Sequence, residues 1–254
     1  MVPERRYRAL VGYDGTDFLG YQIQAQGRTV QGEIEKVLKK VTQADIRIDG
    51  AGRTDAGVHA TGQVIAFNAS WKHSLEDFQR ALNALLPADI VISDLQPVKR
   101  TFHPRFGAVS RSYQYIIINQ PWPSVLERRY TYHVRNLLDV AAMRQASQFL
   151  VGAHDFASFG KPPQGENTVR QVMGADWSTA GTRLIFEITA NAFLYRMVRT
   201  IVGTLVQVGL GQLAPLEIKD ILAAGDLTQS APPVPAHGLC LVRVSYPENN
   251  RENN

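Results

Sequence analysis

Turns too short for a crossover helix, such as the one between the strand-like segments 168–177 and 182–189, limit the possible folds of this chain more than any other feature. In the first strand-like segment of the chain, alternate residues are apolar or aromatic, namely Tyr7, Ala9, Val11 and Tyr13. This two-residue period indicates a strand with one buried face. Parallel strands need a connection of about a dozen or more residues, whereas antiparallel strands need only a turn. The sequence therefore predicts an α+β fold with a mainly antiparallel sheet and helices packed on it.

Four helices are predicted from capping residues and apolar spacing. The first begins after Thr29, with a buried face of Val30, Ile34, Val37, Leu38 and Val41. The second begins after Ser74 and is expected to bury Leu75, Phe78, Leu82 and Leu85. The third begins after Asp139, and the apolar stretch 197–210 indicates a buried fourth helix. Further strands are predicted over residues 46–49, 63–68, 90–98, 112–119, 168–177 and 182–189.

The length of 254 residues suits one large domain or two smaller halves, each with its own core. We expect an N-terminal α+β half over residues 1–120 and a C-terminal α+β half over residues 121–246. The Pro-rich region Pro121–Pro123 is the expected linker between them. Residues 247–254 are polar and are expected to form a disordered tail.

Composition narrows the class of protein. With 27 Lys and Arg against 23 Asp and Glu, the net charge of +4 fits a polyanionic partner without requiring one. The single cysteine, Cys240, excludes an internal disulfide and indicates a reducing compartment, and its apolar neighbours indicate a buried strand thiol. The N-terminal residues lack the apolar core of a signal peptide, so we expect a cytoplasmic protein. The six histidines are scattered without ligand spacing, so no metal site is predicted.

The run Gly50–His59 is the segment most suited to chemistry, because three glycines surround one carboxylate, Asp55, with Arg53 beside it. Glycines allow positive φ and close approach of the backbone to another molecule. An arginine next to a carboxylate suits work on an anionic substrate, by keeping the carboxylate ionised or by neutralising a phosphate. The alternative is a tight turn in which Asp55 accepts backbone hydrogen bonds, and composition alone slightly favours it.

Several further motifs occur in order along the chain. They are Gly12–Thr16, Phe18–Gln22, Thr29–Gly32, Gly62–Val64, Phe102–Phe106, Arg111–Tyr115, Asn191–Arg199 and Val202–Gly203. In this order and spacing, together with Gly50–His59, the chain resembles the tRNA pseudouridine synthase A family from about Tyr7 to Tyr246. Tyr21 and Gln114 depart from the family pattern, in which tryptophan and a basic residue are commoner at these positions. These departures bear on RNA contacts and leave the chemistry unchanged.

The resemblance implies isomerisation of uridine to pseudouridine at positions 38–40 of the tRNA anticodon stem-loop, without a cofactor. It also implies two pseudo-symmetric halves with a basic RNA-binding cleft between them, and a homodimer that binds one tRNA across both subunits. Asp55 matches the catalytic aspartate and Tyr113 the tyrosine that packs on the target base. Arg199 matches the arginine that pairs with the aspartate, and Arg53 the arginine expected to contact the target nucleotide or its phosphate. A strip of basic residues that includes Arg105 is expected to hold RNA phosphates.

These assignments have ordinary alternatives. A uridine in a stem must be turned out of the stack and received on an aromatic surface, which suits Tyr113. Taken alone, however, Tyr113 and Tyr115 also fit the alternating core positions of a strand. Arg199 also fits an arginine whose charged end reaches out from a buried helix.

Two rival functions are open at this stage. In one, Asp14 and Asp55 form the carboxylate pair of a hydrolase, so that replacing either one would be equally damaging. In the other, the protein binds RNA without catalysing a reaction, and the glycine-rich turn only clamps backbone. The most apolar stretch contains Arg199 and Gln207 and is shorter than the ~20 residues that cross a bilayer, so no membrane partner is expected.

Overall fold

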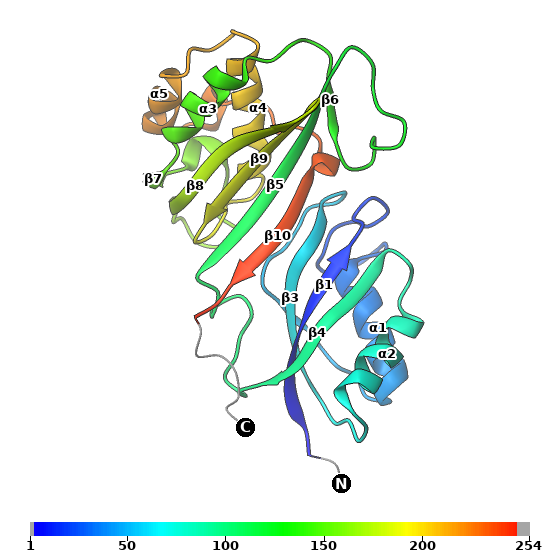
Figure 1. The fold of residues 1–254 in the computed structure, drawn as a ribbon. Helices are drawn as coiled ribbons and strands as arrows, with labels where there is room; N and C mark the ends of the chain where they lie inside the picture. Colours follow the sequence, from blue (N-terminus) through cyan, green and yellow to red (C-terminus); the bar gives the residue numbers. More distant parts are fainter. Residues whose placement is uncertain (1–2, 248–254) are drawn as a thin grey trace. The chain divides into compact units, whose positions relative to one another are not determined.

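The computed structural model describes residues 3–247, and these form two compact units (Figure 1). Unit 1 comprises the chain up to Val109 together with the residues from Leu241 onward, and unit 2 comprises Ser110–Cys240. Each unit contains a mainly antiparallel sheet with helices packed on it. The predicted α+β class is therefore confirmed.

The sheet of unit 1 has the strand order β4-β1-β3-β10. The strands are β1 (Arg5–Tyr13), β3 (His59–Ala69), β4 (Ile90–Val98) and the part of β10 (Leu239–Ser245) from Leu241 onward. The short strand β2 (Asp49–Gly50) pairs with β3. Tyr7 lies opposite Phe67, and the alternate β1 residues predicted to face the core are buried.

Two helices pack on the unit 1 sheet, α1 (Val30–Thr42) and α2 (Leu75–Leu85). They lie against each other, and α2 packs against β4 (Figure 1). Both begin as predicted, because the side chains of Thr29 and Ser74 accept hydrogen bonds from the backbone N–H groups of Gly32 and Asp77. The rings of Tyr7, Phe67 and Phe78 pack together in this core, with their centroids 5.6–6.1 Å apart.

The sheet of unit 2 has the strand order β5-β9-β8-β7. Its strands are β5 (Ser110–Asn119), β7 (Gly152–Asp155), β8 (Val169–Ala180) and β9 (Arg183–Ala190), with β6 (Tyr132–Val134) parallel to β5. The α-helices are α3 (Val140–Gln148), α4 (Met197–Gly209) and α5 (Glu217–Ala224). Three short 3₁₀ helices complete it, η1 (Ala157–Phe159), η2 (Leu227–Gln229) and η3 (Ala236–Gly238). The predicted buried helix is confirmed, because almost all of α4 is buried.

The predicted strand over residues 46–49 is largely wrong, since only Asp49 and Gly50 pair with a neighbouring strand. Ile46 and Ile48 are nevertheless buried. The backbone of Ile48 is satisfied by side chains of α1, because its N–H donates to Glu35 Oε1 at 3.1 Å and its carbonyl accepts from Gln31 Nε2 at 3.4 Å. A buried segment whose polar groups bond to a helix needs no strand partner.

The two units differ from the halves expected from the sequence. Ser110–Asn119 belongs to unit 2, because β5 pairs along its length with β9. The residues from Leu241 belong to unit 1, and Pro121–Pro123 lies inside unit 2. Pro247 ends the described chain, so the remainder of the expected tail lies outside the described residues.

Some smaller details also differ from the expectations. Val41 in α1 and Leu75 at the start of α2 are only half-buried, and Leu85 at the end of α2 is exposed. Cys240 lies in a strand as predicted but is only partly buried. Helix α5 was not predicted, although its buried residues Ile218, Ile221 and Leu222 have helical spacing.

Candidate active site

Asp55 lies in the loop of residues 51–58, between β2 and β3, and we call this segment the Asp55 loop. The loop is fixed to β3 at its start, where Ala51 N–H donates to Val64 O at 2.8 Å and Gln63 Nε2 donates to Gly52 O at 2.8 Å. Its far end is a turn in which Val58 N–H donates to Asp55 O at 3.2 Å. Asp55 is half-buried, not buried as a residue of the interior would be. Its backbone is therefore held firmly while its side chain lies near the surface of the unit.

Residues 13–21, which follow from β1, cover the middle of the Asp55 loop, and we call them segment 13–21. The hydroxyl of Tyr13 lies 2.7 Å from Thr54 Oγ1, and the N–H of Tyr21 donates to Thr54 O at 3.1 Å. Gly20 has φ +100°, and a Cβ there would lie 2.8 Å from Thr54 O. Only glycine fits this position, because both the backbone angle and the close approach exclude a side chain.

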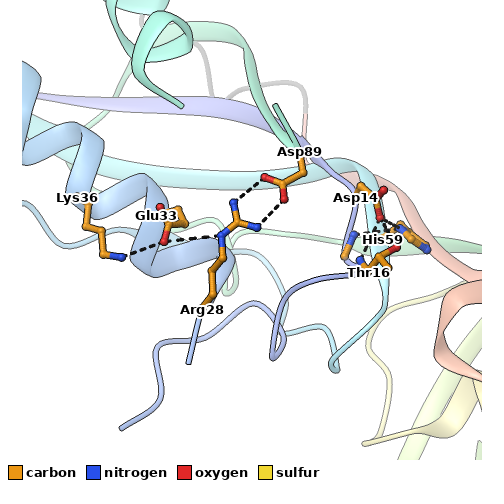
Figure 2. A network of polar contacts seen from close by, with 8 residues as sticks. Asp14, Thr16, Arg28, Glu33, Lys36, His59 and Asp89 are labelled. Atoms are coloured by element: carbon orange, nitrogen blue, oxygen red, sulfur yellow. Dashed lines mark hydrogen bonds and ion pairs between the residues drawn. The ribbon is translucent and has the colours of Figure 1, made fainter. Parts of the chain in front are cut away.

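The same segment also contacts the far end of the loop. Gly15 N–H donates to Nδ1 of His59, the first residue of β3, at 3.0 Å. A Cβ on Gly15 would overlap the backbone oxygen of Val58. Figure 2 shows Asp14, Thr16 and His59 converging at this point. Segment 13–21 thus holds the Asp55 loop on both sides of Asp55.

The ion pair between Arg28 and Asp89 also holds segment 13–21 in place. Arg28 donates to both carboxylate oxygens of Asp89, at 2.6 and 2.8 Å, and this two-bond contact raises the pKa of Arg28 further (Figure 2). Arg28 also lies over the ring of Phe18 at 4.1 Å, and its carbonyl accepts from Leu19 N–H. The N–H of Asp14 donates to Asp89 O at 3.0 Å. Asp89 therefore holds segment 13–21 at two places, directly at Asp14 and through Arg28 at Leu19.

We predict that Gly15→Ala lowers turnover by about 10²-fold, because the added methyl group must displace Val58 and with it the Asp55 loop. Overpacking of this kind also destabilises by about 1–3 kcal/mol. Rates measured at saturating substrate and thermal denaturation test both effects. Gly174→Ala is the matched control, because a Cβ at Gly174 meets nothing within 4 Å. Equal behaviour of the two variants would contradict the assigned role of Gly15.

Tyr21 carries a buried hydroxyl for which the described residues offer no hydrogen-bond partner. Burial raises the pKa of Tyr21 well above its usual value, and the nearby Tyr13 and Glu35 raise it further. An unsatisfied buried hydroxyl costs free energy. We therefore expect Tyr21→Phe to raise the melting temperature by about 2–4 °C, which corresponds to about 1 kcal/mol.

Tyr13→Phe is the control for this substitution, because it removes a hydroxyl that is bonded to Thr54. It should lower the melting temperature. A lower melting temperature for Tyr21→Phe as well would mean that ordered solvent satisfies the Tyr21 hydroxyl.

The two other predicted site residues of unit 1 lie in loops. Arg53 is exposed, two residues before Asp55. Arg105 is half-buried in the turn between β4 and β5, with its guanidinium 5.6 Å from the centre of the Phe106 ring. His103 shapes this turn, since its Nδ1 faces the N–H groups of Arg105 and Phe106 at 3.1 and 3.4 Å.

Tyr113 and Arg199 belong to unit 2. Tyr113 lies in β5, is 9% exposed and meets the ring of Phe193 edge-on, with centroids 5.0 Å apart. Arg199 lies in the first turn of α4 and is half-buried. Its Nε donates to Val234 O at 2.7 Å, and its own carbonyl accepts from Val234 N–H. The five predicted residues are thus divided between the units, with Asp55, Arg53 and Arg105 in unit 1.

Two other kinds of site are absent from residues 3–247. No group of three or more His, Cys, Asp or Glu side chains has the arrangement of a metal site. None of the helices in this range combines the length and the apolar character that a membrane crossing demands. An open hollow of about 470 Å³ beside α1 is lined partly by ion-paired residues, and it contains none of the predicted site residues.

The family model for tRNA pseudouridine synthase matches residues 9–107 and 146–247, which is more than half of the chain. The chain belongs to the tRNA pseudouridine synthase family. A relative from Brevibacillus brevis named tRNA pseudouridine synthase A is 46% identical over 95% of this chain and 100% of its own length. A relative of the same name from Halalkalibacterium halodurans is 43% identical over 98% of this chain and 96% of its own.

A solved structure of an archaeal box H/ACA ribonucleoprotein complex matches 94% of this chain and 49% of the other, at 12% identity and a TM-score of 0.37. A score this low leaves the family assignment resting on sequence. Membership of the tRNA pseudouridine synthase family makes the chain an isomerase and overturns both rival functions, the hydrolase and the binding module without chemistry. The structure also explains Asp14, whose Oδ1 accepts from the N–H and hydroxyl of Thr16 within its own turn.

Sequence reasoning missed the part played by segment 13–21 and gave His59 no role in holding the Asp55 loop. Gly15 and Gly20 are required by close packing against the Asp55 loop. Their close approach to Val58 and Thr54 joins positions 34 or more residues apart, and no local pattern reports such a contact. The available signal was that Gly15 and Gly20 lie within the two motifs Gly12–Thr16 and Phe18–Gln22, which precede the first helix.

Proposed function

We propose that the protein converts uridine to pseudouridine at positions 38–40 of the tRNA anticodon stem-loop, with Asp55 as the catalytic residue. The N1–C1′ bond breaks, the base turns within the site, and a C5–C1′ bond forms. The proton leaves C5 and N1 gains one, so the product is an isomer of the substrate. Such a rearrangement needs a well-positioned carboxylate as nucleophile or general base, and no oxidant or second substrate.

The observation that carries the proposal is the fixation of the Asp55 loop. Its backbone is bonded at Ala51, Gly52, Thr54 and Asp55, while the Asp55 side chain remains half-buried. Catalysis favours a reactive group whose position is fixed before the substrate arrives. Fixing a carboxylate loop this tightly is more than a simple surface turn requires.

The other site residues are assigned roles that fit their surroundings. Turning a uridine out of a helix costs a few kcal/mol and calls for an aromatic surface. Tyr113, supported edge-on by Phe193, is proposed to pack on the target base. Arg199 is proposed to pair with Asp55. The exposed Arg53 is proposed to contact the target nucleotide or its phosphate, and Arg105 the RNA backbone.

The test is nucleoside mapping of unmodified tRNAs incubated with the purified protein. We expect pseudouridine only in tRNAs with uridine at positions 38–40, and the yield should survive exhaustive chelation because the proposed chemistry uses no metal. Matched tRNAs with cytidine at these positions are the control. Pseudouridine at other positions would refute the assigned specificity, and dependence on a metal would refute the cofactor-free mechanism.

We further propose that the protein acts in the cytoplasm as a homodimer that binds one tRNA. Unit 2 supports self-association, because large apolar side chains between β5 and α3 are exposed, namely Trp122, Val125, Leu126 and Leu137. Sedimentation equilibrium tests the proposal. A single species at the 28.2 kDa mass of one chain, at micromolar concentration with and without tRNA, would exclude the dimer.

A further inference from the structure

One ring nitrogen of His59 faces two different groups. Its Nδ1 lies 3.0 Å from the backbone nitrogen of Gly15 and 3.2 Å from Oδ1 of Asp14 (Figure 2). An imidazole nitrogen either accepts a hydrogen bond through its lone pair or donates one through its N–H. The two contacts therefore require opposite protonation of the same atom, and only one can be a hydrogen bond at a time.

The surroundings of His59 decide between them. The N–H of Gly15 can only donate, and the bond to Nδ1 is buried. Asp14 Oδ1 does not depend on His59, because it already accepts from Thr16 N–H at 3.0 Å and from Thr16 Oγ1 at 2.6 Å. A protonated Nδ1 would leave a buried amide without an acceptor and add a third donor to a satisfied oxygen. The arrangement therefore favours a neutral imidazole with its lone pair on Nδ1 and its proton on Nε2.

This single bond has a mechanical consequence for the Asp55 loop. Thr54, just before Asp55, is held by Tyr13 and by the N–H of Tyr21. After Asp55, Tyr13 of the same segment pairs with Ala60, and the connection closest to Asp55 includes the Gly15–His59 bond and the contact between Gly15 and Val58 O. Without an acceptor at Nδ1, the buried N–H of Gly15 would move to find another partner and carry Val58 with it.

We propose that His59 is a positioning residue for Asp55, acting as a neutral hydrogen-bond acceptor that ties segment 13–21 to the C-terminal side of the Asp55 loop. The inference rests on the proposed catalytic role of Asp55. His59 itself touches no reacting atom in this scheme. What the reaction requires of it is a lone pair at the position of Nδ1, and not a proton or a positive charge.

Two amide substitutions separate these possibilities. In His59→Asn the side-chain oxygen can occupy the place of Nδ1 and accept from Gly15, whereas in His59→Gln the amide lies farther out, near the place of Nε2. We expect His59→Asn to keep turnover within about 3-fold of wild type, and His59→Gln to lose about 10²-fold with unchanged tRNA affinity. Single-turnover rates, filter-binding affinities and melting temperatures are measured for both.

Equal turnover of the two variants, whether high or low, would overturn the proposal, because the acceptor position would then be irrelevant. Each variant should have the same circular dichroism spectrum as the wild type, which shows that it is folded. The ¹⁵N shift of His59 Nδ1, assigned by its absence in His59→Asn, distinguishes a lone pair from an N–H. A protonated Nδ1 at neutral pH would overturn the proposal independently of any variant. Asp55→Asn is measured in parallel, and its full activity would refute the catalytic assignment and not the hydrogen-bond role of His59.

Discussion

Asp55→Asn should abolish pseudouridine formation while leaving tRNA affinity close to that of the wild type. Asparagine keeps the size of the side chain and one acceptor oxygen, but it cannot act as a nucleophile or a general base. The backbone bonds that fix the loop, at Gly52, Thr54 and Asp55, do not involve the carboxylate and should persist. We expect turnover to fall by about 10⁴-fold or more, the upper range for removal of a catalytic acid–base group.

The measurement is single-turnover pseudouridine yield at saturating enzyme, with tRNA affinity from filter binding. Asp220→Asn, an exposed position on α5, is the control for loss of a carboxylate that has no proposed role. A yield from Asp55→Asn within tenfold of wild type would remove Asp55 from the mechanism. A parallel loss of tRNA affinity would indicate that the substitution damages binding and not chemistry.

Arg199→Met is expected to lower turnover by about 10²–10³-fold, the range seen when one preorganised electrostatic partner is removed from an active site. Methionine keeps much of the length and apolar character of the arginine stem within the buried helix α4 but removes its charge. The variant also loses the bond from Nε to Val234 O. The bond between the backbone groups of Val234 and Arg199 should remain and hold the local structure.

Two further variants separate charge from structure. Arg199→Lys restores the charge without the planar fork of donors, so we expect turnover between those of Arg199→Met and the wild type. Arg144→Met is the matched control, because Arg144 on α3 likewise donates to a backbone carbonyl, that of Trp177, at 2.6 Å. If both methionine variants lose the same stability and neither loses turnover, Arg199 is a structural residue.

Much of the fold could be predicted from local patterns. Strand β1 shows its two-residue period, and the caps Thr29, Ser74 and Asp139 begin the helices where they were expected. Local patterns fail where the decisive partner is distant in sequence. Ile48 resembles a strand residue, yet Glu35 and Gln31 of α1 satisfy its backbone.

For the candidate site, too, local patterns predicted some features and missed others. A glycine-rich turn around Asp55 between two strands could be recognised, because glycine, arginine and aspartate are adjacent in the chain. The contacts that fix this turn join residues of β1 and segment 13–21 to residues about 40 positions later, as Tyr13 is joined to Thr54 and Gly15 to His59. Tyr113 is buried in β5, so the expectation of a core strand residue described its environment correctly without excluding a role at the base.

The division of unit 1 between the two ends of the chain affects how the protein is made. The ribosome synthesises Asp55 and β3 early, then the whole of unit 2, and only then the residues from Leu241 that pair beside β3. Gly62 of β3 has no room for a Cβ because the backbone of Val242 in β10 lies against it, so β10 packs closely beside β3. Until it emerges, the nascent chain carries an open strand edge, which is a site for mispairing and aggregation. Unit 2 is continuous in sequence and can fold on the ribosome in the meantime, so the sheet behind the Asp55 loop is completed last.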